Sequence, residues 1–342
     1  MTTARLRIRR ACKSALAVLA LLAATHAQTD QEQLSAARAL LRAGNTDEAI
    51  ARLQQVAQQH PAMAEVNREL GGAYYQKPDY ERAIVYLTRA VEDNAQDLES
   101  VQRLGLAYYL SGQPARAIPY LERLRAVQPA HGSDDPFVLA LCYALTGDHR
   151  HALSLVSQLY DLPASSPASR LVFGRILLLR GLDPVAEEQA RQVLQQAPRT
   201  PLAHFLLAQI SLYRSDVTNA ISEFRAELEM NPGYALAWTR LGDAYTRVGQ
   251  LDQAEAALRR GLWLDASNAE TYVLLGKLMM KRRQFASVPQ VLQRALAIDP
   301  NDYTAHNLLG EAYRELGQIA LAQRELQIGA RLQRQQVAPT RR

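Results

Sequence analysis

Few residues of this 342-residue chain carry side chains suited to catalysis or metal binding: it has seven histidines and two cysteines. His149 and His151 stand on either side of Arg150 and could form half of a metal site. Alternate residues that enter a helix point to different sides, however, and no carboxylate or cysteine completes a ligand set. The sequence therefore predicts no metal site.

Motifs for cofactors and nucleophiles are missing as well. No glycine-rich loop follows a strand-like segment, which leaves no cradle for a phosphate group. No serine stands in a nucleophile-elbow motif. We expect no catalytic residue, no cofactor and no enzymatic activity.

The first 27 residues have the pattern of a secretory signal peptide. Basic residues within 1–14 precede a wholly apolar run from Ala15 to Ala24, and small residues follow it up to Ala27. The alternative is a membrane anchor, but this run is about half of the ~20 residues that span a bilayer. We expect cleavage after Ala27 and a mature chain that begins at Gln28. That chain would lie in the periplasm or elsewhere in the cell envelope, with no membrane span after leader cleavage.

The leader also accounts for the excess of basic residues. The whole chain has 39 Lys and Arg against 34 Asp and Glu, and the leader holds five of the basic residues and none of the acidic ones. The mature chain would therefore be neutral, which removes the main support for a nucleic-acid partner. It would keep one cysteine, Cys142, which we expect to be a buried small apolar group without a disulfide partner.

A 34-residue pattern organises the rest of the chain, and Ala235–Asn268 shows it clearly. Counted from Ala235, large apolar residues occupy positions 4, 7, 11 and 24, and small residues occupy positions 8, 20 and 27. These spacings predict one face of each of two helices. Gly249 would end the first helix in the left-handed conformation, and Asp252 would cap the second. The small Gly242 and Ala254, at positions 8 and 20, would let the two helices cross closely.

The pattern recurs along nearly the whole chain. Every repeat has Gly or Ala at position 8, and position 20 is Ala everywhere except at Val288. Several repeats carry Pro at position 32, where it cannot continue the preceding helix. Each step is 34 residues except for one of 35, which makes Gly132 an extra loop residue. The repeats begin at Asp30, Ala64, Leu98, Ser133, Pro167, Pro201, Ala235, Ala269 and Tyr303.

This pattern resembles the tetratricopeptide repeat (TPR). The resemblance implies an all-α solenoid, a right-handed superhelix of about nine helix-turn-helix repeats over residues 30–336, with a C-terminal tail at 337–342. The segments 129–136 and 161–169 read as loops in an unbroken stack. His204 and His306 occupy position 4, a packing position, so we expect them to be core or half-buried histidines.

The resemblance also implies a concave groove, lined by positions 2, 5, 9, 12 and 13 of the first helix of each repeat. These positions are mostly apolar in repeats three to six and polar in repeats seven to nine. The alternative is that several of the apolar residues pack against neighbouring helices. The pairs at positions 5 and 9, such as Val273/Lys277 and Asn307/Glu311, do not reproduce the family's carboxylate clamp. The predicted groove residues are Tyr109, Phe137, Leu141, Arg175, Phe205, Tyr213, Arg247, Lys277, Lys281 and Arg314.

A large apolar patch on a soluble protein usually has a partner. The sequence therefore predicts a non-catalytic scaffold of the cell envelope, which binds a peptide segment or a partner subunit in the groove. We expect a bipartite ligand, with an apolar segment in the middle and negative charge toward repeats seven to nine. The alternative is an accessory or docking subunit that recruits or activates an envelope enzyme complex, for polysaccharide export or for pilus or secretion assembly.

Overall fold

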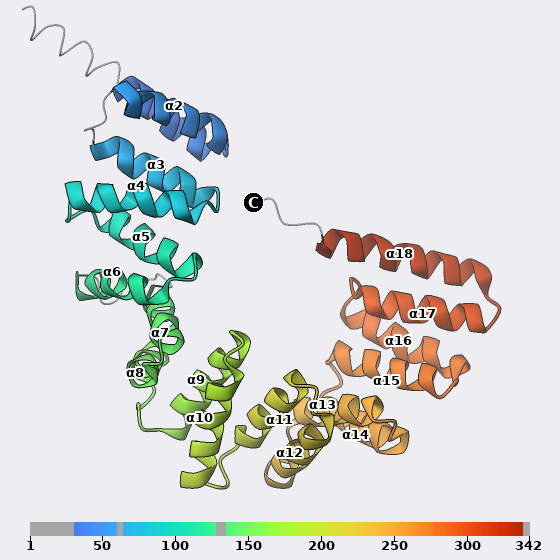
Figure 1. Ribbon diagram of the computed structural model, residues 1–342. Helices are drawn as coiled ribbons and strands as arrows, with labels where there is room; N and C mark the ends of the chain where they lie inside the picture. The colour runs from blue at the N-terminus through green and yellow to red at the C-terminus, as the bar shows by residue number, and fades with distance from the viewer. Residues whose placement is uncertain (1–30, 60–63, 128–134, 338–342) are drawn as a thin grey trace, which may run out of the picture. The chain divides into compact units, whose positions relative to one another are not determined.

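The structure is a computed structural model that describes residues 31–59, 64–127 and 135–337 (Figure 1). Within these ranges every regular element is a helix, as the repeat pattern predicts. The predicted leader 1–27 with its cleavage site, the extra loop residue Gly132 and the residues from 338 onward lie outside the described ranges. No helix of the described ranges is long and apolar enough to cross a membrane.

The chain divides into two compact units, Met1–Ala164 (unit 1) and Ser165–Arg342 (unit 2), and each is described separately. The division falls inside the segment 161–169, which the sequence marks as a proline-containing loop. The prediction of a stack that runs unbroken through this segment stays a prediction.

Both units consist of helix pairs in chain order. In unit 1 a helix at 31–42 is followed by α2 (Thr46–Gln59), α3 (Ala64–Gln76), α4 (Tyr80–Asp93), α5 (Leu98–Leu110), α6 (Pro114–Val127), α7 (Asp135–Leu145) and α8 (His149–Leu159). Unit 2 contains α9 (Pro167–Leu179), α10 (Asp183–Gln196), α11 (Ala203–Tyr213), α12 (Val217–Met230), α13 (Ala235–Arg247), α14 (Leu251–Leu264), α15 (Ala269–Lys281), the 3₁₀ turn η1 (Phe285–Ser287), α16 (Val288–Ile298), α17 (Tyr303–Glu315) and α18 (Ile319–Val337).

From α3 onward, odd-numbered helices are the first helices of the predicted repeats (A helices) and even-numbered ones are the second (B helices). From α2 to α8 and from α9 to α18 each helix packs against the next, and α3 also touches α5, α5 touches α7, α9 touches α11, α13 touches α15 and α15 touches α17. Apolar residues therefore form a continuous core between the pairs, in which α15, α16 and α17 share one cluster. This is the packing expected of a repeat protein, in which each repeat contacts its neighbours.

The helix crossings depend on glycine at position 8, as predicted. A Cβ atom added to Gly242 would lie 2.6 Å from Cγ of Leu258 and 3.2 Å from the carbonyl oxygen of Ala254. Leu258 is fully buried, so it has no room to move aside. The same contact between positions 8 and 24 recurs at Gly71–Leu87, Gly105–Leu121, Gly276–Leu292 and Gly310–Leu326.

One predicted helix end is confirmed and one is wrong. Gly249 has a φ of +80°, which glycine adopts without strain, and it ends α13 as expected. Asp252 does not cap α14, because the turn after Gly249 makes Gln250 the residue that precedes the helix. Asp252 lies inside the first turn, and its carboxylate pairs instead with Arg282.

The helix pair that contains Val288, the exception at position 20, differs from the regular pair. A 3₁₀ turn, Phe285–Ser287, precedes α16, which begins only at Val288. Val288 is nevertheless fully buried in the cluster that joins α15 to α17. The larger side chain is thus accommodated where the B helix begins.

Three position-4 side chains are held by hydrogen bonds, the two histidines within their own repeats and Trp238 to the preceding one. Nδ1 of His204 lies 2.6 Å from a Glu223 oxygen, and Nδ1 of His306 lies 2.7 Å from a Glu325 oxygen. Trp238 donates its indole N–H to the carbonyl oxygen of Pro232 at 2.9 Å. Both histidines are at least half buried.

His151 is likewise engaged inside its repeat. Its Nδ1 lies 2.6 Å from the Asp148 carboxylate, and its ring stacks on that of Tyr143. Asp148 in turn accepts the backbone N–H of His151 and caps α8. This arrangement stabilises the start of a helix.

Cys142 is fully buried in α7, as predicted, and burial raises the pKa of its thiol to about 12. Only the thiolate reacts with alkylating agents. We therefore expect Cys142 to resist iodoacetamide at pH 8 in the folded protein and to react fully in denaturant. Mass spectrometry of the peptide that contains Cys142 measures this directly. Equal labelling rates in the two conditions would show that α7 opens readily.

Candidate functional site

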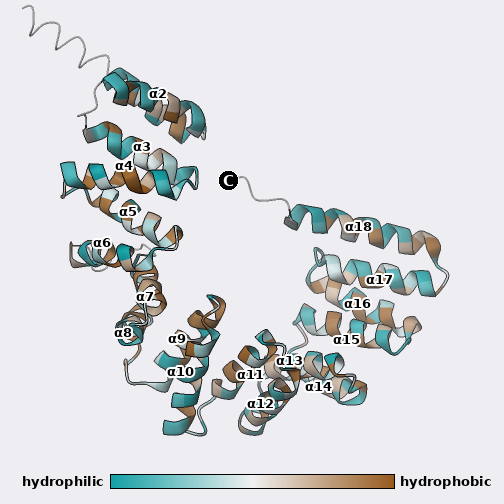
Figure 2. Ribbon diagram, viewed as in Figure 1, coloured by the Kyte–Doolittle hydropathy of each residue, from teal (hydrophilic) through white to brown (hydrophobic). Residues whose placement is uncertain are grey.

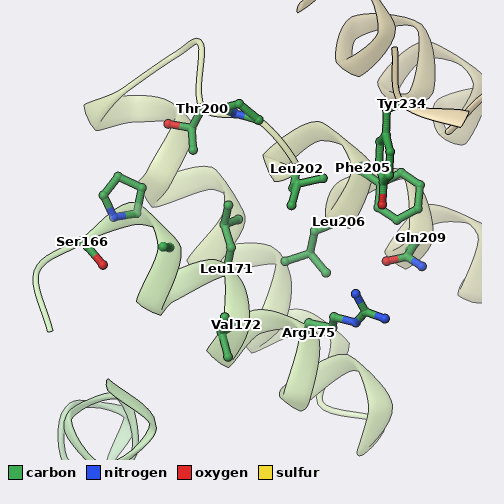
Figure 3. A pocket seen from close by; sticks show the side chains of 13 residues that line it. Ser166, Leu171, Val172, Arg175, Thr200, Leu202, Phe205, Leu206, Gln209 and Tyr234 are labelled. Atoms are coloured by element: carbon green, nitrogen blue, oxygen red, sulfur yellow. The ribbon is translucent and has the colours of Figure 1, made fainter. Parts of the chain in front are cut away.

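An apolar pocket of about 500 Å³ lies between α9 and α11 in unit 2. Side chains at positions 2, 5, 6 and 9 of both A helices line it, and Tyr234, the residue before α13, lies at one end (Figure 3). Figure 2 shows α11 as largely hydrophobic, whereas α10 is mostly hydrophilic. Positions 2, 5 and 9 among these lining positions are positions that the sequence assigns to the predicted groove.

The start of α9 forms the first edge of the pocket. Ser166 caps this helix, because its Oγ accepts the backbone N–H of Ser169 at 3.2 Å. Pro167 follows at the first helical position, where it needs no hydrogen-bond acceptor. Ser166, Pro167 and Ala168 line the pocket at this edge.

The start of α11 also borders the pocket and has an unusual cap. Leu202, the residue before the helix, is left-handed with a φ of +72°, and its own side chain provides no cap. The carboxylate of Glu227, on α12, accepts the backbone N–H of Leu202 at 2.9 Å and that of Phe205 at 3.3 Å. Glu227 is fully buried. A carboxylate at a helix N-terminus also interacts favourably with the helix dipole.

We expect Glu227→Gln to lower the free energy of unfolding by about 1 kcal/mol, because hydrogen bonds to a charged acceptor are stronger than those to a neutral one. The substitution preserves size and one acceptor oxygen. Urea unfolding followed by the fluorescence of Trp238 and Trp263, both in unit 2, measures the change. Glu229→Gln, at an exposed position of the same helix, is the control. Equal stabilities of the two variants would contradict the cap.

One wall of the pocket belongs to an aromatic cluster. The ring of Phe205 lies 5.6 Å from that of Phe224 and 5.0 Å from that of Tyr234, measured between centroids. Phe205 is only 4% exposed. A ligand in the pocket would therefore meet one face of a ring that is otherwise part of the core.

The end of the pocket near Tyr234 is polar. Figure 3 shows Arg175, Gln209 and Tyr234 together on this side, away from Ser166 and Thr200. Arg175 is exposed, and Gln209 is half-buried. Burial raises the pKa of Tyr234 above its ordinary value, so the phenol is neutral at physiological pH. These groups give an otherwise apolar pocket one hydrophilic end.

The structure brings two predicted groove residues, Arg175 and Phe205, to this pocket. Tyr213 lies outside it and is 65% exposed at the end of α11. The prediction that Phe205 is an exposed anchor needs correction, because Tyr234 and Phe224 cover most of its ring.

Three predicted groove residues belong to unit 1. Leu141 is only 2% exposed, so it packs in the core of α7 and offers no surface to a ligand, contrary to the prediction. Tyr109 and Phe137 are half-buried. A groove shared by these residues and those of unit 2 stays a prediction.

The predicted cations near the C-terminus differ in their availability. Arg247 pairs with Asp243 at 2.6 Å, and Nζ of Lys281 donates to the carbonyl oxygen of Thr246 at 2.7 Å. Lys277 and Arg314 are exposed, with no ion pair among the described residues. A ligand could therefore pair with Lys277 or Arg314 without first breaking an ion pair.

Sequence reasoning missed the buried carboxylate that shapes the pocket. Glu227 occupies position 27, a position that Ala, Gly or an apolar residue fills in the other repeats. A single acidic residue at a packing position was therefore the available signal. Tyr234 lies between two repeats, outside the helix positions considered for the groove.

Comparison with protein families gives matches along most of the chain. Models described as tetratricopeptide repeat match residues 34–98 and 171–235 in one case, and 99–131, 212–278 and 291–324 in three others. A comparison with curated proteins gives no match.

Several solved structures are similar at low identity. The crystal structure of the APC/C hetero-tetramer Cut9–Hcn1 is 20% identical with a TM-score of 0.43, and the similarity covers 78% of this chain and 52% of that one. This chain thus spans about half the length of that one. MamA is 19% identical with a TM-score of 0.45, covering 48% of this chain and 95% of that one. MamA 41-end from Desulfovibrio magneticus RS-1 is 19% identical with a TM-score of 0.46, covering 50% and 97%.

Proposed function

Because the chain belongs to the tetratricopeptide repeat family, we propose that it is a non-catalytic scaffold of the cell envelope that binds a peptide segment of a partner protein. The observation that carries this proposal is the α9–α11 pocket, which is apolar and lies on the A helices. Concave, mostly apolar sites with a few polar groups are typical of ligand binding.

The size of the pocket suits bulky side chains of a partner. Its volume of about 500 Å³ is roughly three times that of a ~150 Å³ engineered cavity that binds benzene. Ala168 and the 44% exposed Leu202 stand at its edges. A partner segment could therefore insert more than one apolar side chain and cover these edge residues.

Acidic residues on one side of this segment would meet Lys277 and Arg314. Both are exposed, on α15 and α17 of the same unit. Charges at the edge of an interface mainly raise the association rate and set the orientation. The ligand would then be apolar at the pocket and acidic toward α17.

The envelope location rests on the leader at 1–27. We expect the mature protein to begin at Gln28 and to be released with the periplasmic fraction. Intact-mass measurement of the released protein checks both points. A species that retains Met1 to Ala27 would point to a tethered protein instead.

The groove is tested with 12-residue peptides selected from a random display library on the mature chain. Ala168→Trp places an indole at the pocket edge and should weaken the selected peptides by about tenfold or more, a loss of ~1.4 kcal/mol. Ala330→Trp, at an exposed position of α18, is the matched control. Peptides that bind both variants equally well would show that the pocket is not the binding site.

A further inference from the structure

The polar end of the α9–α11 pocket presents hydrogen-bond donors without acceptors. The guanidinium of Arg175, the amide of Gln209 and the hydroxyl of Tyr234 all line the pocket. Among the described residues none of these three groups has a hydrogen bond or an ion pair. The pocket therefore has donors of its own for a ligand.

No acidic side chain lines the pocket to neutralise Arg175. The acidic side chain whose charge affects the pKa of Tyr234, as the charge of Arg175 also does, is Glu227. Its carboxylate is fully buried and already accepts the backbone N–H groups of Leu202 and Phe205. The charge of Arg175 is thus left for a group that comes from outside.

The three donors differ in kind but suit the same acceptor. A guanidinium can bind both oxygens of a carboxylate, and charge-assisted hydrogen bonds are about twice as strong as neutral ones. The Gln209 amide and the neutral Tyr234 phenol can each donate one further hydrogen bond. An apolar side chain of the ligand, seated against the walls beside them, would exclude water and so strengthen such contacts.

We propose that Arg175, Gln209 and Tyr234 form a carboxylate-binding site, so that the peptide taken by this pocket carries an Asp or Glu next to bulky apolar residues. This inference rests on the proposed function and specifies its ligand. The next A helix, α13, begins at Ala235, directly after Tyr234. A segment that fills the pocket can therefore run on, which favours a side-chain carboxylate over a chain terminus.

The test is a double-mutant cycle on peptides selected from the random 12-residue library. Replacing the selected acid by its amide should weaken binding to the natural protein by roughly 10- to 100-fold, in line with hydrogen bonds to charged groups. In Arg175→Gln the same replacement in the peptide should change the affinity by less than about threefold. Arg294→Gln removes an exposed charge on the B helix α16, outside the pocket, and should preserve the discrimination.

Gln209→Leu is a second variant, and it should reduce the discrimination several-fold while the apolar contacts remain. Folding of each variant is checked by Trp238 and Trp263 fluorescence. Selected peptides without an acid, or discrimination that survives in Arg175→Gln, would overturn the carboxylate site and leave the scaffold intact. Binding that depends on a free peptide C-terminus would overturn the side-chain assignment. Binding unaffected by Ala168→Trp would overturn the proposed function itself.

Discussion

Phe205→Ala is expected to lower the free energy of unfolding of unit 2 by about 3–5 kcal/mol, the range for truncation of a buried phenylalanine. The ring is 4% exposed and packs between Phe224 and Tyr234. Its removal would leave a cavity that the neighbouring rings fill only in part. Urea unfolding followed by tryptophan fluorescence measures the change, since both tryptophans lie in unit 2.

Tyr213→Ala provides the matched control on the same helix. Tyr213 is 65% exposed, so its truncation should change stability by no more than about 0.5 kcal/mol. Peptide affinity must be expressed per folded molecule, because loss of folding imitates loss of binding. Equal effects of the two substitutions on stability would contradict the aromatic cluster.

Gly242→Leu is expected to cost about 1–3 kcal/mol or more, because a bulky side chain is forced into a helix crossing. Even a Cβ atom would lie 2.6 Å from Leu258, which is fully buried. The gain in helix propensity, about 1 kcal/mol, offsets only part of this cost. The melting of the helices, followed by circular dichroism, is the measurement.

Gly233→Leu is the control for this second substitution. An added Cβ atom at Gly233 meets nothing within 4 Å, so the larger side chain can extend into solvent. We expect its effect on stability to stay within about 0.5 kcal/mol. If Gly242→Leu has the same melting temperature as the natural protein, the assignment of position 8 to the crossing is wrong.

The fold could be predicted because its determinants are local and repeated. Gly242 and Leu258 are 16 positions apart in one repeat, and the same spacing joins Gly276 to Leu292. A contact of this kind leaves a periodic trace in the sequence. Helix ends were less predictable, since a shift of two residues decides whether Asp252 caps α14 or pairs with Arg282.

The site was predicted only in part, because its shape depends on residues that break the period. The position-9 residue Arg175 was found from the repeat frame. The burial of Phe205 depends on Tyr234, which belongs to the connection between two repeats. The left-handed Leu202 and its contact with Glu227 arise from a side chain 25 residues away that replaces a packing residue.

The recurring contact between positions 8 and 24 has a consequence for how such a chain changes length. In five repeats of the described ranges the crossing is closed by two residues of the same repeat, as with Gly242 and Leu258 or Gly310 and Leu326. Duplicating such a 34-residue segment therefore adds both residues of a crossing, and deleting one removes both. Grafting α13 and α14 in tandem would lengthen unit 2 by one step without a new steric fit at the crossing. The α9–α11 pocket has no such independence, because its lining comes from more than one repeat and includes Ser166, before α9, and Tyr234, before α13.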